Sequence, residues 1–474
     1  MKNVAKFTDC VKIHFVTRKD VNFFMKYKKR HLMAAIFSAF TLISGQALAI
    51  SVDNLMQIVP KDSATDKTIS WQADDDRSDY SVQYRQKGSS DVKEAYVTEG
   101  KRPPIYDADN PAPYTYGAYM QKLTPATDYE YRIVDSDGAT GWFPFTTTKE
   151  NVNNYKVLIF GDSQSTDYGV WGQTANIAWQ QNQDAAFFVN MGDITDNGQA
   201  YFQWRAWFDN ADVLTSHIPF APVMGNHEAY SMDWQFAEPY TYKALFAVPY
   251  GGPKDQNRMA YSFDYGDVHY VSLNTDEEEL GSWRPTMMQD EAAWLDKDLA
   301  AAQKAGKRLI VMMHRPPWNS PYDGNLDVNG KYFMPLFDKY NVPLVFTAHE
   351  HCYERTVPIK NDQAADNGTI YIATGRSGTE AWDGSVKKPT DVIYYNPTDM
   401  PMYLTLQVEP DAFRVSAMKN DGTLIDSVSI PAKAQQAEAP AAEVKSDTAA
   451  AAPKEMKKKN VKKHKTKVNK NKQK

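Results

Sequence analysis

The chain has 474 residues, of which 42% are hydrophobic and 24% are charged, and its formal net charge is −6. This composition is ordinary for a globular protein, and the length is enough for about three domains with ample core. Its two cysteines are Cys10 and Cys352, and Cys10 falls in a segment that we expect to be removed. The composition therefore excludes an internal disulfide in the mature chain, whose stability must come from packed cores and bound metal.

The N-terminal residues 1–49 have the pattern of an upstream segment followed by a secretory signal peptide. Met25–His31 is basic, Leu32–Gly45 is apolar but short for a bilayer span, and Ala47-Leu48-Ala49 offers a small-x-small cleavage site. We expect cleavage after Ala49, no transmembrane anchor afterwards, and a secreted, periplasmic or envelope-associated protein. The alternative is an uncleaved membrane anchor.

Residues 50–150 read as an all-β domain. Thr68–Gln72, Tyr80–Gln86, Tyr114–Leu123 and Tyr129–Val134 alternate apolar and polar side chains and are separated by turn-forming residues. About a hundred residues of this kind fit a small β-sandwich. The domain has no cluster of histidine, aspartate and cysteine, so we expect it to serve as a packing or orienting module.

Residues 151–432 alternate core-strand runs with helical stretches, which predicts an α/β layered domain whose site lies at strand ends. Thr286–Gly306 has apolar residues at helical spacing and closes on a glycine. Ala260–Thr275 predicts a hairpin that turns at Gly266-Asp267.

Residues 433–474 change to alanine, proline and lysine, a composition that predicts a disordered basic tail. Pro453–Lys474 holds eleven lysines and one glutamate, so its removal would change the net charge from −6 to −16. The tail is either simply solvated or attaches the acidic protein to an anionic envelope polymer. A lysine run without interleaved aromatic residues is a poor base reader, so we expect no specific nucleic-acid partner.

The chemistry is expected where short apolar runs end on aspartate, asparagine or histidine. The central run is Ala185–Asp196, and the others are Val157–Asp162, Ala221–His227, Leu309–His314 and Leu344–His351. His349 and His351 are one residue apart, so on extended backbone both rings would face the same side. An Asp/Asn/His set from five strand ends predicts a pair of hard-to-borderline metal ions, because a zinc finger would use cysteines.

These motifs resemble those of the calcineurin-like metallophosphoesterases. Between Tyr155 and about Ile430 they occur in the order GD, GD, GNHE, VMMH and HEH. Gly225–Glu228, Met313–Pro316 and His349–Thr356 resemble the purple acid phosphatase branch. The resemblance implies an α/β fold with four layers, α/β/β/α, in which helices flank a β-sandwich. It also implies a preceding fibronectin-III-like sandwich and two metal ions, drawn from Fe, Zn or Mn.

Carried over by position, the resemblance makes Asp193 the bridging carboxylate, with Asp162 and His351 on the first metal. It puts Asn226, His314 and His349 on the second. A hydroxide generated on the metals would attack the phosphorus of a phosphorylated small molecule in line. His227, beside Asn226, would then protonate the leaving oxygen as general acid.

Two positions depart from the family pattern, and both affect the first metal. The purple branch has a tyrosine, which binds ferric iron and gives the colour, where this chain has Asp196. The wider superfamily has a histidine where this chain has Gln164. Asp196 and Gln164 are thus weaker replacement ligands, and we expect a colourless protein with a weakly held first metal and a less acidic pH optimum than the family name implies.

Other residues in or near the motifs have weaker assignments. Arg315, Arg376 and Arg355 could grip phosphate, and structural ion pairs are the alternative. Tyr353 and Glu354 are expected to orient the ligand loop. His217 and His269 are expected to be structural, and Cys352 to point away from the site.

The leading functional hypothesis is a metal-dependent phosphoric ester hydrolase acting on phosphomonoesters. The alternatives are a phosphodiesterase of the same fold and an envelope-binding protein impaired at the first metal. His227 and Asp193 are intact, which favours the enzyme.

Overall fold

The computed structural model describes residues 48–77, 79–98 and 100–432. Most of the expected signal peptide and the whole lysine-rich tail lie outside the described residues. Within the described residues, every helix is too short or too polar to cross a bilayer.

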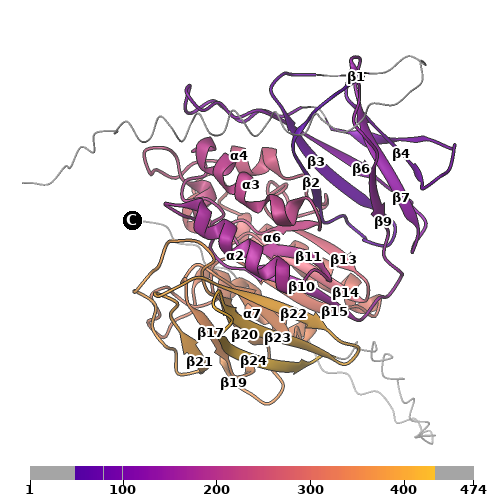
Figure 1. The fold of residues 1–474 in the computed structure, drawn as a ribbon. Coiled ribbons are helices and arrows are strands. Elements are labelled where there is room, and N and C mark those ends of the chain that lie inside the picture. Colours follow the sequence, from indigo (N-terminus) through magenta and orange to yellow (C-terminus); the bar gives the residue numbers. More distant parts are fainter. Residues whose placement is uncertain (1–47, 78, 99, 433–474) are drawn as a thin grey trace, which may run out of the picture.

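The N-terminal part is a domain whose strands pair antiparallel except for the two short strands β1 and β8, which are parallel (Figure 1). All four predicted strands are present. Its core contains Trp71 stacked on Tyr116, with ring centroids 5.5 Å apart. The strands are β1 (Leu48–Ala49), β2 (Asp53–Ile58), β3 (Lys67–Ala73), β4 (Ser81–Gln86), β5 (Lys93–Val97), β6 (Tyr114–Met120), β7 (Asp128–Val134), β8 (Gly138–Ala139) and β9 (Phe143–Thr146).

The second part contains two sheets. In the first, three parallel strands and three antiparallel ones follow the order β12, β11, β10, β22, β23, β24. Two helices, α2 (Tyr168–Gln181) and α3 (Tyr201–Thr215), pack on it. The strands are β10 (Tyr155–Phe160), β11 (Ala185–Asn190), β12 (Phe220–Pro222), β22 (Met402–Val408), β23 (Ala412–Lys419) and β24 (Leu424–Pro431).

The other sheet has seven strands in the order β13, β14, β15, β16, β20, β17, β21. Helices α6 (Met287–Lys304) and α7 (Val328–Tyr340) pack together, α6 against β15 and α7 against β20. Both the predicted helix, which is α6, and the hairpin of β13 and β14 are confirmed. The strands are β13 (Tyr261–Tyr265), β14 (Val268–Leu273), β15 (Arg308–Met313), β16 (Leu344–Thr347), β17 (Tyr353–Thr356), β20 (Ile370–Thr374) and β21 (Asp391–Tyr395).

Short elements complete the fold: η1 (Asn226–Ala229), α4 (Tyr240–Leu245), α5 (Glu277–Leu280), β18 (Ile359–Lys360) and β19 (Gln363–Ala364). Strand alternation sends successive residues of β11 to opposite layers. Phe187 packs edge-on against Tyr270 of the other sheet, at 5.3 Å. Phe188 stacks on Phe220, which also contacts Trp207 of α3. The predicted α/β/β/α layering is thus confirmed.

The N-terminal domain is joined to the first sheet of the second part. Ile58 of β2 pairs with Phe220 of β12, so the two sheets continue into one of 15 strands. Side chains reinforce the junction, since the Tyr201 hydroxyl donates to Gln72 Oε1 at 2.7 Å.

Candidate metal centre

The predicted site residues meet at the ends of strands from both sheets. Asp162 follows β10, Asp193 follows β11 and Asn226 follows β12 in the first sheet. From the second sheet, His314 follows β15, and His349 and His351 follow β16. Because the two sheets face one another, their strand ends bring these side chains into one buried cluster.

The backbone at these strand ends is unusual. Gly192 has φ 101° and Asp193 has φ 48°. A Cβ atom at Gly192 would lie 2.6 Å from His314 Nδ1, so only glycine fits there. His349 and His351 have φ 69° and 52°, and β16 ends at Thr347, so the expectation of two rings on extended backbone was wrong. Left-handed turns, not strand alternation, direct both histidines toward the cluster.

The second half-site comprises Asp193, Asn226, His314 and His349. Asn226 Oδ1 lies 3.1 Å from His314 Nε2 and 2.9 Å from His349 Nδ1. Asp193 Oδ2 lies 3.1 Å from His314 Nε2. His314 Nδ1 donates to the Met191 carbonyl at 2.9 Å, which leaves Nε2 free to bind a metal.

The first half-site comprises Asp162, Asp193 and His351, whose ligand atoms lie within 4.8 Å of one another. His351 Nε2 is 3.6 Å from Asp162 Oδ1, and that oxygen has no hydrogen-bond partner. The backbone N–H of His349 donates to Asp162 Oδ2 at 3.2 Å, which fixes the carboxylate. Asp193 belongs to both half-sites, as a bridging ligand requires.

The charges of the cluster call for cations. Burial raises the pKa of Asp162, and the neighbouring Asp193 charge adds to the shift. At Asp193 burial is outweighed by His314 and His227, whose charges lower its pKa. Burial acts against protonation of His314, yet Asp193 and Asp162 raise its pKa to about 10. This buried pair of carboxylates thus draws positive charge, which metal ions supply.

The other two histidines are held neutral, as metal ligands must be. Burial lowers the pKa of His351 to about 4, and burial together with Arg315 lowers that of His349. With the unpartnered Asp162 oxygen, this donor set fits two metal ions.

The two departures from the family pattern both lie beside the first half-site. Gln164 donates its backbone N–H to the Asp193 carbonyl at 2.9 Å, and its buried Oε1 has no hydrogen-bond partner. Asp196 is half-buried, with Oδ1 3.8 Å from His227 Nδ1. Burial raises the pKa of Asp196, and Asp193 and Glu380 contribute.

His227 lies at the exposed edge of the cluster. Its Nδ1 donates to the Asp196 carbonyl at 2.7 Å, and its Nε2 is 4.0 Å from Asp193 Oδ2. Its backbone N–H donates to Asp193 Oδ1 at 2.9 Å. With Nδ1 committed to a carbonyl, Nε2 carries a proton only in the imidazolium form, so it is the position from which a proton can be given.

Sequence reasoning missed the buried Glu228. Its carboxylate accepts the backbone N–H groups of Asp193 at 3.0 Å, Ile194 at 2.9 Å and Gly225 at 2.9 Å. It thereby holds the loops that carry Asp193 and Asn226 together. Its place in the GNHE motif was the sequence signal that could have identified Glu228 as part of the site.

A second missed residue is Lys388, which is buried with two glutamates under the histidine loop. Its Nζ donates to Glu350 Oε2 at 3.0 Å and to Glu354 Oε2. Glu350 lies between the ligands His349 and His351, so this ion pair fixes the loop. Burial raises the pKa of Glu354 to about 8. Lys388 follows Lys387 directly, and the sequence gives no signal that distinguishes the buried lysine from its neighbour.

The three arginines that were predicted to grip phosphate have protein partners in the structure. Arg315 pairs with Glu279 at 2.5 Å, and Arg376 donates to the carbonyls of Pro397 at 2.8 Å and Gly378 at 2.6 Å. Arg355 pairs with Asp426 at 2.6 Å. These contacts are those of the structural alternative, and the assignment of Arg315 and Arg376 as substrate ligands stays a prediction.

The remaining assignments concern residues outside the ligand cluster. His269 lies between Asp264 at 2.6 Å and Asp298 at 2.7 Å, and His217 packs on Trp179. Cys352 is buried beside Glu350 and Glu354.

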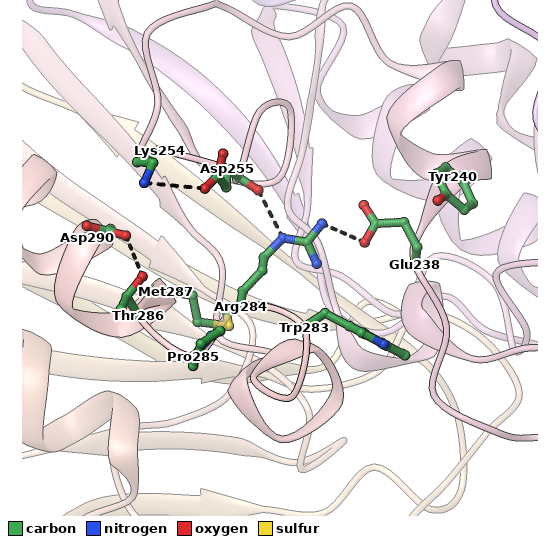
Figure 2. Close-up of a pocket in the computed structure, with 10 residues that line it drawn as sticks. All are labelled: Glu238, Tyr240, Lys254, Asp255, Trp283, Arg284, Pro285, Thr286, Met287 and Asp290. Carbon is green, nitrogen blue, oxygen red and sulfur yellow. Dashed lines mark hydrogen bonds and ion pairs between the residues drawn. The ribbon is translucent and has the colours of Figure 1, made fainter.

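A separate cavity of about 590 Å³ lies outside the cluster (Figure 2). In Figure 2, Arg284 spans it, donating to the Asp255 carbonyl at 2.9 Å and to Glu238 at 2.5 Å. The residues that line this cavity do not include a residue of either half-site. Trp283 lies at its edge.

Comparison with known proteins agrees with this geometry. Residues 155–353 match the calcineurin-like phosphoesterase family, and residues 54–147 match the purple acid phosphatase N-terminal domain. Acid phosphatase type 7 of Mus musculus is 30% identical over 305 residues, which cover 56% of this chain and 65% of the relative. Purple acid phosphatase 23 of Arabidopsis thaliana is 26% identical, covering 58% and 65%. These alignments thus span just under two thirds of the relatives' length.

Among solved structures, a purple acid phosphatase from yellow lupin (Lupinus luteus) seeds shares the fold. Its TM-score is 0.67 at 18% sequence identity, covering 80% of this chain and 74% of that one. Residues 155–353 match the calcineurin-like phosphoesterases, and residues 54–147 match the N-terminal domain of the purple acid phosphatases, a pair of domains whose fold the lupin enzyme shares.

Proposed function

We propose that this protein is a metal-dependent phosphoric ester hydrolase that acts on phosphomonoesters. The observation that carries the proposal is the bridging position of Asp193 between two sets of donors, Asp162 with His351 and Asn226 with His314 and His349. Two cations held there would neutralise phosphoryl charge and make a water molecule acidic enough to serve as nucleophile near neutral pH.

The chain's own residues supply the remaining chemistry. Asp193 and Glu228 fix the loop that presents His227, because Asp193 accepts the His227 backbone N–H and Glu228 accepts that of Asp193. The Asp196 carbonyl holds His227 Nδ1, so Nε2, which lies 4.0 Å from Asp193 Oδ2 at the edge of the cluster, is the nitrogen that would protonate the leaving oxygen. His227 is thus the proposed general acid.

The test is turnover of p-nitrophenyl phosphate by the full chain after chelation and re-addition of iron, zinc or manganese, with metal content measured alongside. His227→Ala should retain both metals but lose about 10²- to 10⁴-fold in turnover, the usual contribution of a general acid. The exposed His217→Ala is the matched control and should change neither quantity.

One or no metal per chain, with no turnover under any reconstitution, would overturn the proposal and favour a binding protein. Faster turnover of bis(p-nitrophenyl) phosphate than of the monoester would instead favour a phosphodiesterase.

We also propose that the protein is exported and that its lysine-rich tail attaches it to an anionic envelope polymer. The support is the Met25–Ala49 pattern and the eleven lysines of Pro453–Lys474. Replacing the apolar run Leu32–Gly45 with a polar one should retain the protein in the cytoplasm. Deleting Lys454–Lys474 should move it from the envelope to the soluble fraction, as high salt should; unchanged partition would contradict the attachment.

A further inference from the structure

Trp234 has a backbone and an exposure that the fold does not explain. Its φ is 61°, a left-handed conformation that a bulky side chain rarely adopts. The side chain is also 52% exposed. Strained backbone of this kind persists only where the surroundings impose it, and it gathers at functional sites.

Hydrogen bonds tie the turn of Trp234 to the metal centre. The Trp234 N–H donates to the Ser231 carbonyl at 2.8 Å, and the Ser231 N–H donates to the Gln235 carbonyl at 2.8 Å. The side-chain amide of Asn197 also donates to the Ser231 carbonyl, at 2.6 Å. Because Asn197 directly follows Asp196 in the loop that carries Asp193, the indole has a fixed place relative to the cluster.

The indole lies beside the proposed general acid. The Trp234 and His227 rings are 6.2 Å apart and nearly perpendicular, at 83°. Tyr230 packs against both, with centroids 5.4 Å from His227 and 6.0 Å from Trp234. The oxygen that receives the proton of His227 belongs to the leaving group, so the leaving group must lie on this side of the phosphorus.

We propose that Trp234 is a specificity-determining platform for leaving groups that are aromatic rings bonded directly to the ester oxygen, that is, for aryl phosphates. This inference rests on the proposed function. A flat aromatic ring stacks on an indole face at centroid spacings of about 4.5 to 7 Å, and Trp234 is 52% exposed beside the proposed general acid. An alkyl or polyol group offers no such face.

The test compares phenyl phosphate with glycerol phosphate in the wild type, Trp234→Ala and Trp234→Phe. Aryl esters are intrinsically more reactive, so the measured quantity is the change in the ratio of the two kcat/KM values, in which that reactivity cancels. The ratio should fall about 5- to 10-fold in Trp234→Ala, in line with the loss of one aromatic stack. It should stay within about twofold in Trp234→Phe, which keeps an aromatic face.

Trp283→Ala is the matched control, because Trp283 is 53% exposed but lies at the separate cavity of Figure 2. It should leave the ratio unchanged. An equal loss on both esters in Trp234→Ala, or no loss, would overturn the inference.

A binding measurement separates this inference from the proposed function. Calorimetry with the non-hydrolysable phenylphosphonate and ethylphosphonate on the metal-loaded protein needs no turnover. A preference for phenylphosphonate that is lost in Trp234→Ala supports the platform even if neither ester is hydrolysed, in which case only the proposed function fails. Equal affinity for both phosphonates in the wild type overturns the platform.

Discussion

The two half-sites share Asp193 but differ in how the protein completes them. In the second, Asn226, His314 and His349 converge at 2.9 to 3.1 Å, and His314 is oriented by the Met191 carbonyl. In the first, His351 is 3.6 Å from Asp162, and the nearby Gln164 oxygen lacks a partner. The second half-site is preorganised by protein contacts, whereas the first leaves more to the ion itself.

This difference indicates which half-site holds its metal ion more tightly. Donors fixed before binding lose little freedom when an ion arrives, so the second half-site should bind tightly. Donors without partners must be ordered by the ion, so the first should exchange its metal more readily. Four experiments break or sharpen this contrast, in order of decreasing effect.

The largest effect is expected from Asp193→Asn, which weakens both half-sites at once. Removing a mere hydrogen-bond partner of a metal ligand costs about 10- to 100-fold in affinity, so loss of the bridging charge should cost at least about 100-fold at each half-site. Elemental analysis should show both ions lost and turnover abolished. The exposed Asp184→Asn is the control, and retention of one tight ion in Asp193→Asn would show that the aspartate is not shared.

The next effect compares His314→Ala with His351→Ala. His314→Ala should empty the second half-site, and in the metal-free protein it should lower the free energy of unfolding by about 3 to 5 kcal/mol, because it leaves buried carboxylates without a charged partner. His351→Ala should leave one metal per chain after dialysis. Metal content and urea unfolding measure both, and equal metal loss in the two variants would erase the proposed asymmetry.

Lys388→Met tests the support beneath the histidine loop. With Lys388 gone, Glu350 and Glu354 are buried together without a cation, which should cost about 3 to 5 kcal/mol of unfolding free energy. Since Glu350 joins His349 to His351, metal retention should fall in both half-sites. The exposed neighbour Lys387→Met should behave as wild type. Normal stability in Lys388→Met would mean that the ion pair does not hold the loop.

The smallest effect is a gain. Gln164→His or Asp196→Tyr restores a family ligand beside the first half-site, so its metal affinity should rise about tenfold or more, the lower end of what one supporting group contributes. With iron, Asp196→Tyr should also give a visible absorption band that the wild type lacks. A wild-type protein that already absorbs strongly would contradict the assignment of Asp196.

Much of the fold was predictable because it depends on local pattern. The helix at Met287–Lys304 and the hairpin of Tyr261–Tyr265 with Val268–Leu273 follow from periodicity and turn residues. The pairing of Ile58 with Phe220 was not predictable, because strands more than 150 residues apart pair without any local sequence signature.

The residues that gather at the site were predictable, but the backbone geometry and the ion pairs that hold them in place were not. The strand-end pattern predicted Asp162, Asp193 and the histidines. The left-handed backbone of His349 and His351, and the ion pair of the intervening Glu350 with Lys388, have no signal in that pattern. The ion pair of Arg315 with Glu279 was not predictable either, because the two residues are 36 positions apart in the sequence. Partners distant along the chain decide whether a charged residue is free.

The joined sheet has a consequence for how the protein can be divided. The β12 strand is three residues long, and its outer edge is covered by Ile58, with the Val59 N–H donating to the Phe220 carbonyl at 3.0 Å. Removing residues 54–147 would uncover that edge, a template for pairing with other chains. The residue range that matches the phosphoesterase family is thus shorter than the smallest unit that keeps this strand edge covered.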